Sequence, residues 1–278
     1  MTLTQHKDEA IDNWVTDETK REGKYEPFSD SVYAQVIAKI ESLLGEKRAL
    51  FLDLGCGSGA FSKRLAHRNF KVVAADLSSI MLAHALKFCG NDPNVHLARI
   101  EAEQLPFHNN TFDAVLCFAL HHHFLLYEAL VSEVSRVLKI GGWLCICDPN
   151  ALNPHIFLLM HPYSPVRYSR LTANQKPINP FTLSAQYAKH GIFLEADFLS
   201  LSVRPREGVR KQGFWFHPVI YRYVGFVLNS IKEPWRYVPA IVCFNFVHLI
   251  MRFLPAKYRA NYVFLYGQKQ AGGIDATV

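Results

Sequence analysis

Residues 49–60 read ALFLDLGCGSGA, an apolar run that stops at a group of glycines. The run over residues 49–54 predicts a buried β-strand, and Gly55, Gly57 and Gly59 allow the backbone to turn tightly and approach a ligand. A helix that begins at this turn would direct its first N–H groups toward such a ligand. The stretch therefore predicts the strand, glycine loop and helix with which α/β sheets hold nucleotides.

Short apolar runs alternate with amphipathic stretches from residue 48 to residue 148. Besides 49–54, strands are expected at residues 71–76, 95–100, 112–118 and 143–148, and helices at 59–68, 79–89 and 125–138, the last one ended by Gly141-Gly142. Strands that alternate with helices predict right-handed crossovers and a mainly parallel α/β sheet. Sheets of this type bind ligands at the carboxyl ends of their strands.

The pattern changes after Asp148. A proline-rich connection covers residues 149–180, and the expected elements beyond it are a helix at 181–190 and strands at 193–203 and 261–269. Between those two strands, residues 204–260 have a helical pattern rich in aromatic side chains, although a short hairpin would suffice there. We expect a core domain of residues 49–203 and 261–270, a helical N-terminal lead-in over 1–48, and a helical cap over 204–260.

The composition limits the class of protein. A chain of 278 residues with 50% hydrophobic and 19% charged side chains is too long for a disulfide mini-protein and too apolar for a disordered chain. Its six cysteines form no C-x-x-C pair, so neither a zinc site nor a disulfide framework is expected. The polar, acidic start of the chain shows no signal-peptide pattern, and we expect a cytoplasmic protein.

The net charge of +6 is distributed unevenly. Residues 1–150 hold 15 Lys and Arg against 19 Asp and Glu, whereas residues 151–278 hold 15 against 5, a net charge of +10. This excess fits an anionic partner, either nucleic acid or a membrane surface, and fits a solvated basic face equally well. Basic residues beside the aromatic runs of 204–260 would suit an interfacial helix that touches anionic lipid, and would suit a pocket for a long apolar or phosphorylated acceptor equally well. The aromatic side chains would also suit a small second core.

The glycine loop by itself is compatible with two kinds of nucleotide. Gly55-x-Gly57-x-x-Ala60 also satisfies the dinucleotide fingerprint, with Asp76 near the position of its ribose-binding acid. A dinucleotide would place its pyrophosphate against this turn, where the Asp53 carboxylate would repel it. S-adenosylmethionine has an ammonium group, no phosphate, and ribose hydroxyls that suit Asp76. The charge of Asp53 therefore favours S-adenosylmethionine, since charge-assisted hydrogen bonds contribute roughly 1.5–3 kcal/mol each.

Six stretches of the chain, taken in order, resemble one known family. They are DLGCGSG at 53–59, AADLS at 74–78, EAEQLPF at 101–107, FDAVLC at 112–117, LHHH at 120–123 and RVLKIGGWL at 136–144. Their order and spacing resemble the class I S-adenosylmethionine-dependent methyltransferases, in the type 11 group that includes the ubiquinone- and menaquinone-biosynthesis enzymes. The resemblance covers about residues 50–150 and implies a Rossmann-like, seven-stranded, mostly parallel sheet whose last strand is antiparallel.

The resemblance also implies which residues hold the cofactor: Asp53, Gly55, Cys56, Gly57, Gly59, Asp76, Leu77, Met81, Glu101, Ala102 and Phe118. Asp53 and the glycine loop would hold the methionine end, and Asp76 the ribose hydroxyls. Glu101 stands where the family usually has an aspartate that contacts the adenine amino group, and Ala102 would offer a backbone N–H to the ring. Ordinary core packing would also suit Leu77, Met81 and Phe118.

Three histidines, residues 121–123, follow the fourth predicted strand. Methyl transfer mainly requires alignment, and a base is needed only where the acceptor must lose a proton. The resemblance places His122 toward the acceptor, so His122, or else His121, is the candidate to orient or deprotonate it, with capping or packing as the alternative. No metal is expected, because adjacent histidines point in different directions and no carboxylate has ligand spacing.

The sequence thus predicts an S-adenosylmethionine-dependent methyltransferase (EC 2.1.1.-) that acts by in-line displacement. Its expected acceptor is a small molecule, free or lipid-linked, of the lipid, quinone, glycan or secondary-metabolite class. By the family's topology the cap would lie over the site and bind the acceptor, and an anionic membrane surface is a further expected partner. The alternatives are a tRNA or other RNA methyltransferase and a non-catalytic S-adenosylmethionine-binding scaffold protein.

Overall fold

A computed structural model describes residues 28, 30–45, 49–164, 167, 171, 174–200 and 253–271 of the chain. Seven strands form one sheet in the order β3-β2-β1-β4-β5-β7-β6. They are β1 (Leu50–Leu54), β2 (Lys71–Asp76), β3 (Val95–Arg99), β4 (Phe112–Phe118), β5 (Leu138–Pro149), β6 (Glu195–Leu199) and β7 (Tyr262–Gln268). β7 runs antiparallel to both of its neighbours, and the other pairs are parallel. The predicted sheet with an antiparallel last strand is therefore confirmed.

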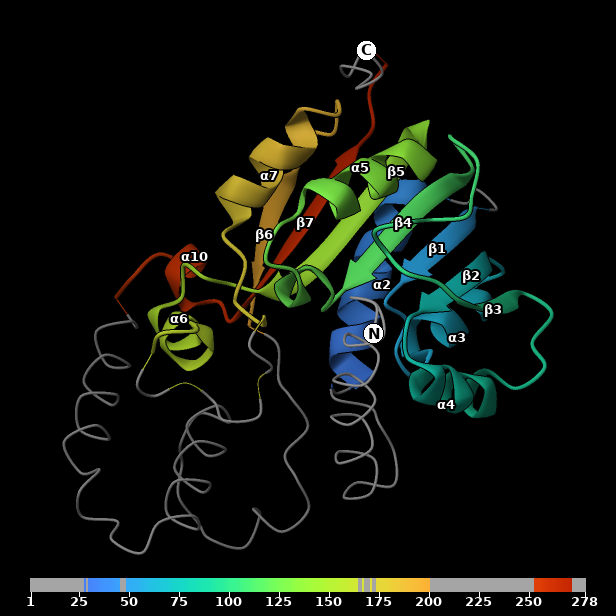
Figure 1. Cartoon of the computed structure of the whole chain (residues 1–278), viewed down its shortest axis with the longest axis horizontal. Helices are drawn as coiled ribbons and strands as arrows, with labels where there is room; N and C mark the ends of the chain where they lie inside the picture. Colours follow the sequence, from blue (N-terminus) through green and yellow to red (C-terminus); the bar gives the residue numbers. More distant parts are fainter. Residues whose placement is uncertain are drawn as a thin grey trace, which may run out of the picture.

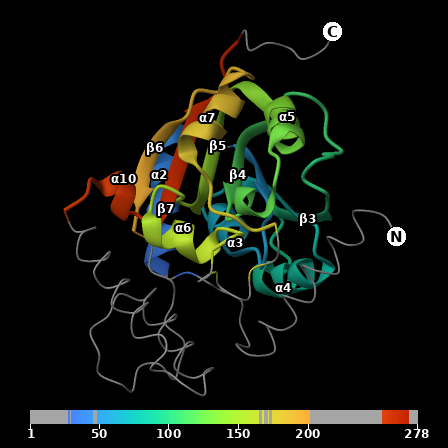
Figure 2. The same ribbon diagram turned by 60° about the vertical axis from the view of Figure 1, so that its left-hand side comes forward.

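Helices cover both faces of this sheet (Figure 1). The described helices are α2 (Asp30–Leu44), α3 (Ala60–Ala66), α4 (Ser79–Cys89), α5 (Glu128–Val137), α6 (Pro154–Met160), α7 (Pro180–Ala188), α10 (Ala256–Arg259) and the 3₁₀ turn η1 (His121–His123). Figure 2 shows α5 and α7 on the face opposite α2, and the buried side chains divide into two clusters accordingly. Burial on both faces explains why the central strands read as continuous apolar runs.

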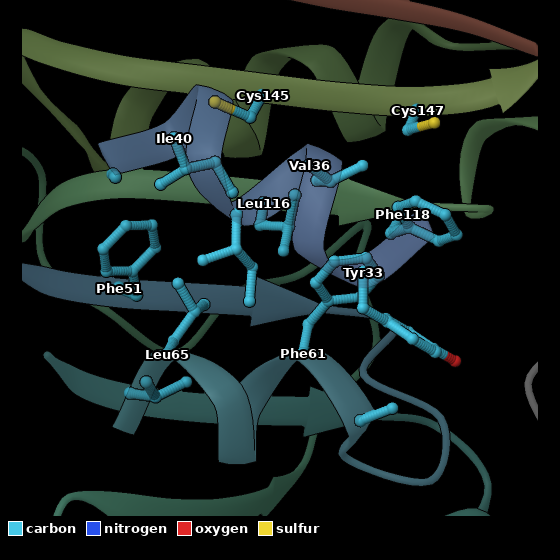
Figure 3. Packing of buried hydrophobic residues seen from close by; sticks show 14 of the residues in the cluster. Tyr33, Val36, Ile40, Phe51, Phe61, Leu65, Leu116, Phe118, Cys145 and Cys147 are labelled. Carbon is cyan, nitrogen blue, oxygen red and sulfur yellow. The ribbon is translucent and has the colours of Figure 1, made fainter. Parts of the chain in front are cut away.

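Side chains of successive strand residues alternate between these two clusters. Phe51 packs with α2 and α3 (Figure 3), whereas Leu52 packs with α5 and α7. The same alternation directs Asp53 toward α3. At the end of β5, Ile146 belongs to the cluster of α5 and α7, so Asp148 is directed to that face. The two carboxylates that end β1 and β5 therefore face opposite layers.

The boundaries expected between residues 125 and 142 are wrong. The helix begins at Glu128 and ends at Val137, after η1 and a short loop. Gly141-Gly142 lies inside β5, where the register against β4 shifts and Gly141 has φ of 77°. These glycines permit an irregular strand to continue its pairing. In the sequence, they look the same as glycines that end a helix.

The expected lead-in and cap are described only in part. Within residues 1–48, helix α2 packs its buried face on the sheet through Val32, Tyr33, Val36, Ile37 and Ile40. Of residues 204–260, only 253–260 belong to the described chain, so the cap lies outside it almost entirely and stays a prediction, as does the division into domains. No helix in the described ranges is long and apolar enough to cross a membrane.

Candidate cofactor and acceptor site

The glycine loop leaves β1 at the carboxyl edge of the sheet. Gly55, Gly57 and Gly59 have φ values of 73°, 53° and 76°, a region that other residues rarely adopt. A Cβ atom added at Gly55 would lie 2.8 Å from Cδ1 of Leu120, and one added at Gly57 would lie 3.1 Å from Cε of Met81. The loop therefore requires glycine both for its conformation and for its close packing.

Hydrogen bonds join the loop to the end of β2. The backbone N–H groups of Gly55 and Cys56 both donate to the carbonyl of Ala75, at 2.8 and 3.0 Å. The N–H of Gly57 donates to Oδ2 of Asp76 at 2.8 Å, and the N–H of Ser78 donates to Oδ1 at 2.9 Å. A carboxylate has about four acceptor positions, so two amide contacts are compatible with further donors such as ribose hydroxyls. The structure thus brings the loop and Asp76 together.

Asp53 lies beneath the loop and not at its mouth. Its side chain is 2% exposed, and the hydroxyl of Ser62 in α3 donates to Oδ2 at 2.5 Å. The pKa of Asp53 is raised to about 7, mainly by burial and also by the nearby charge of Asp76, while the Ser62 hydrogen bond acts in the opposite direction. The carboxyl group of Asp53 is therefore part of the packed layer between β1 and α3.

The residues expected around the adenosine follow β2 and β3: Leu77, Met81, Glu101 and Ala102. Met81 is 4% exposed and packs under Gly57, at the start of a helix that the Ser78 side chain caps. Leu77, Glu101 and Ala102 are partly buried, and the N–H of Ile100 donates to the backbone carbonyl of Asp76 at 3.1 Å. The ends of the two strands are therefore held side by side, with these residues around them.

Phe118, the last residue of β4, belongs largely to the core. Its side chain is 9% exposed, and its ring centroid lies 5.0 Å from that of Phe28 and 4.5 Å from that of Phe61. Figure 3 shows Phe118 among the side chains that α2 and α3 place on this face. The structure therefore shows Phe118 packed in the core, which was the alternative given for this residue from the sequence.

A buried carboxylate beside the histidines was missed by the sequence prediction. Asp148, at the end of β5, is fully buried and accepts hydrogen bonds from the backbone N–H groups of His121 and His122, at 3.1 and 3.2 Å. Nδ1 of His122 lies 2.7 Å from Oδ1 of Asp148, and Nδ1 of His121 lies 3.4 Å from Oδ2. The available signal was an acidic residue at the end of a predicted strand, next to the strand that precedes the histidines.

Burial and neighbouring charges affect these groups differently. Burial disfavours the ionised form of Asp148, but the hydrogen bonds from His121 and His122 outweigh it and hold the pKa of Asp148 well below its usual range. Burial, with the charge of His122, lowers the pKa of His123 to about 3, so His123 is a neutral ring beside the amide of Gln175. The carboxylate of this group is therefore ionised at neutral pH.

Comparison with known proteins identifies the domain that holds this site. Residues 52–146 match a family model described as a methyltransferase domain. The demethylmenaquinone methyltransferase of Clavibacter sepedonicus is 39% identical over 98 residues, which are 35% of this chain and 40% of that protein. The ubiquinone biosynthesis O-methyltransferase of Leptothrix cholodnii is 33% identical over 126 residues, or 43% of this chain and 52% of that protein. The matched segment thus spans about half, or less, of these curated relatives.

A solved structure shows the same fold over most of the chain. The phosphoethanolamine N-methyltransferase 2 of Haemonchus contortus, in complex with S-adenosyl-L-methionine, superposes with a TM-score of 0.56 at 20% identity. The superposition covers 85% of this chain and 52% of that one, and at this identity it speaks for the fold alone. Residues 52–146 of the chain are therefore similar to methyltransferase domains, and they lie within a fold that this S-adenosyl-L-methionine-binding neighbour shares.

Proposed function

We propose that this protein transfers a methyl group from S-adenosylmethionine to a small-molecule acceptor. The observation that carries the proposal is the bond from the N–H of Gly57 to the Asp76 carboxylate, which joins the glycine loop to the acid that we propose binds the ribose. This arrangement lies inside the segment that matches the methyltransferase family model. The fold alone would be insufficient, because one fold supports many functions.

The residues at this edge of the sheet suit the chemistry of S-adenosylmethionine. The carboxylate of Asp76 would accept hydrogen bonds from the ribose hydroxyls, and Leu77 with Met81 would cover the adenine. Glu101 would accept from the adenine amino group. When bound, S-adenosylmethionine supplies a methyl group on a positively charged sulfur, which opens that carbon to in-line displacement. The protein aligns the acceptor and excludes water, and such positioning can supply roughly 7–11 kcal/mol.

We propose a lipid, quinone, glycan or secondary metabolite, free or lipid-linked, as the acceptor, with His122 as the residue that faces it. One of the two curated relatives is named a demethylmenaquinone methyltransferase and the other a ubiquinone biosynthesis O-methyltransferase, which supports an acceptor of quinone-like character. The aromatic composition of residues 204–260 supports an apolar acceptor as well. A membrane-associated acceptor would also make use of the basic residues of that segment.

Titration calorimetry tests the cofactor. We expect the purified protein to bind S-adenosylmethionine and S-adenosylhomocysteine, and to ignore NAD and ATP. Asp76→Ala should weaken that binding about 10- to 100-fold, the effect of one lost charge-assisted hydrogen bond. Asp197→Ala removes a carboxylate on the edge strand β6, paired with Lys39, and should leave the affinity unchanged. Binding of NAD or ATP in preference to S-adenosylmethionine would overturn the proposal.

Release of S-adenosylhomocysteine tests the acceptor class. The protein is incubated with S-adenosylmethionine and either a metabolite extract that contains lipids or bulk tRNA. We expect release with the extract and none with tRNA. Release with tRNA alone would identify an RNA methyltransferase, and cofactor binding without release in either mixture would indicate a scaffold protein.

A further inference from the structure

The carboxyl ends of β4 and β5 place a carboxylate directly against the histidine turn. The parallel register pairs Cys117 with Ile146 and Phe118 with Cys147, so the residues that follow these strands emerge next to each other. Asp148 accepts the backbone N–H groups of both His121 and His122, which fixes the orientation of its carboxylate. The position of this group is therefore set by the backbone of two strands and not by flexible side chains alone.

The two histidines differ in what they can offer to a bound molecule. His121 is fully buried, and its Nε2 lies 2.9 Å from the hydroxyl of Tyr187 in α7. Burial raises the pKa of Tyr187 well above its usual value, so this hydroxyl keeps its proton. The side chain of His122 is 11% exposed, and within the described part of the chain no residue forms a hydrogen bond with its Nε2. Of the two rings, His122 is the one with a nitrogen that a ligand can reach.

The carboxylate also determines where the proton of His122 resides. An ionised carboxylate can only accept hydrogen bonds, so a distance of 2.7 Å between Oδ1 of Asp148 and Nδ1 of His122 requires the proton on Nδ1. In the neutral ring, Nε2 then carries a lone pair and can accept a proton. In general, the hydrogen bond that one ring nitrogen of a histidine makes determines whether the other nitrogen carries a proton.

We propose that Asp148 is a positioning residue that keeps Nε2 of His122 unprotonated, so that His122 takes the proton of an acceptor hydroxyl and the protein methylates oxygen. This inference rests on the proposed function and names its acceptor class. A hydroxyl or phenol keeps its proton at neutral pH, so its attack benefits from a base in the transition state, whereas an amine can lose its proton to water beforehand.

The step balances in atoms and charge. A lone pair of the acceptor oxygen forms the bond to the methyl carbon, and the electron pair of the carbon–sulfur bond that breaks stays on sulfur. The proton of the hydroxyl moves to Nε2 of His122. The resulting imidazolium is paired with the ionised Asp148, and it returns the proton to solvent after the products leave. Asp148 itself stays ionised throughout, as such orienting carboxylates do.

The position of the proton can be read directly by NMR. Long-range ¹H–¹⁵N correlation spectra of histidine-labelled full-length protein separate the Nδ1–H tautomer from the Nε2–H tautomer. The signals of His122 are assigned by their loss in His122→Gln. At a pH at which the ring is neutral, we expect the Nδ1–H tautomer in the protein without ligand and with S-adenosylhomocysteine. An Nε2–H tautomer for His122 in the unaltered protein would overturn the inference.

Two variants separate positioning from simple support of the fold. Asp148→Ala removes the acceptor from Nδ1, so the proton of His122 should move to Nε2, the tautomer that a neutral histidine prefers in water, and release of S-adenosylhomocysteine should fall by at least about 100-fold, with cofactor affinity unchanged. Tyr187→Phe removes the partner of His121 and should leave the His122 tautomer as it was. An unaltered tautomer in Asp148→Ala would refute the role of Asp148.

The outcomes for this inference and for the proposed function are distinguishable. The tautomer of His122 is measured without any acceptor, and cofactor binding is measured by calorimetry. A protein that binds S-adenosylmethionine but shows the Nε2–H tautomer retains the proposed function and loses the base. A methylated product that carries its new methyl group on nitrogen or carbon, with the Nδ1–H tautomer present, would overturn the acceptor class alone.

Discussion

Replacement of Asp53 by asparagine should make the protein more stable, by an amount that grows as the pH rises from about 4 to about 7. The carboxyl group is 2% exposed, and its pKa is raised from 3.8 to about 7, mainly by burial. At about 1.4 kcal/mol per pKa unit, this difference means that folding opposes ionisation of Asp53 by about 4 kcal/mol. Asparagine cannot ionise, yet it keeps an oxygen that can accept the Ser62 hydroxyl.

The direction in which stability changes with pH follows from the number of protons that the folded and the unfolded protein bind. Between about pH 4 and about pH 7 the folded protein holds a proton on Asp53 that the unfolded chain has lost, so stability falls as the pH rises through that range. At about pH 5 the cost is about 1.6 kcal/mol, and above about pH 7 it reaches about 4 kcal/mol. The advantage of Asp53→Asn over the unaltered protein should therefore grow by about 2–3 kcal/mol between about pH 5 and about pH 8.

Urea denaturation of both proteins at these two pH values measures the change. Comparison across pH removes any effect of the amide group that does not depend on pH. Asp92→Asn is the matched control, since Asp92 is partly exposed and its Oδ1 accepts the N–H of Asn94, a bond that asparagine can keep. Its effect at the two pH values is the reference against which the effect of Asp53→Asn is compared. If Asp53→Asn changes the free energy of unfolding equally at the two pH values, the inference that the buried carboxyl group holds its proton is refuted.

Three further predictions concern the cofactor site and the cap. A cationic ligand above Asp53 favours its ionised form, so binding of S-adenosylmethionine at about pH 7 should release protons; calorimetry in buffers of different ionisation enthalpy should detect them, and Asp53→Asn should abolish them. At Gly55, φ is 73° and an added Cβ atom would lie 2.8 Å from Leu120, so Gly55→Ala should lower the free energy of unfolding measured in urea by about 1–3 kcal/mol and weaken cofactor binding. Gly90 has φ of 64° but open space around it, so Gly90→Ala should leave the cofactor affinity unchanged. The basic, aromatic segment 204–260 predicts that the protein floats with anionic vesicles and stays in solution with neutral ones; equal behaviour in both would contradict it.

Much of the sheet could be predicted because its elements are local in sequence. The run from residue 71 to 76 is apolar and ends at an acid, and its strand bounds are those expected. Periodicity is less informative where glycines interrupt it. Gly141-Gly142 lies in an irregular strand, and a bulge and a helix end use the same residue type for the same reason, freedom at positive φ.

The orientation of the site's carboxylates needed the assembled sheet. Asp53 and Asp76 both follow apolar strand residues, yet one lies beneath the loop against Ser62 and the other accepts an amide from the loop. Strand alternation could have shown that Asp53 shares the face of Phe51. Which helix covers that face, and how completely it excludes water, depends on contacts that no local pattern contains.

The sequence alone determined the class of domain, the glycine loop and the acid that accompanies it, because these depend on backbone freedom, charge and short spacings. Only the tertiary structure decided that Asp148 meets His122, 26 residues away along the chain, and that His121 is turned to Tyr187 instead. The physical reason is the pairing of β4 with β5: two strand ends come together across a sheet whose register is set by all of its packed side chains at once.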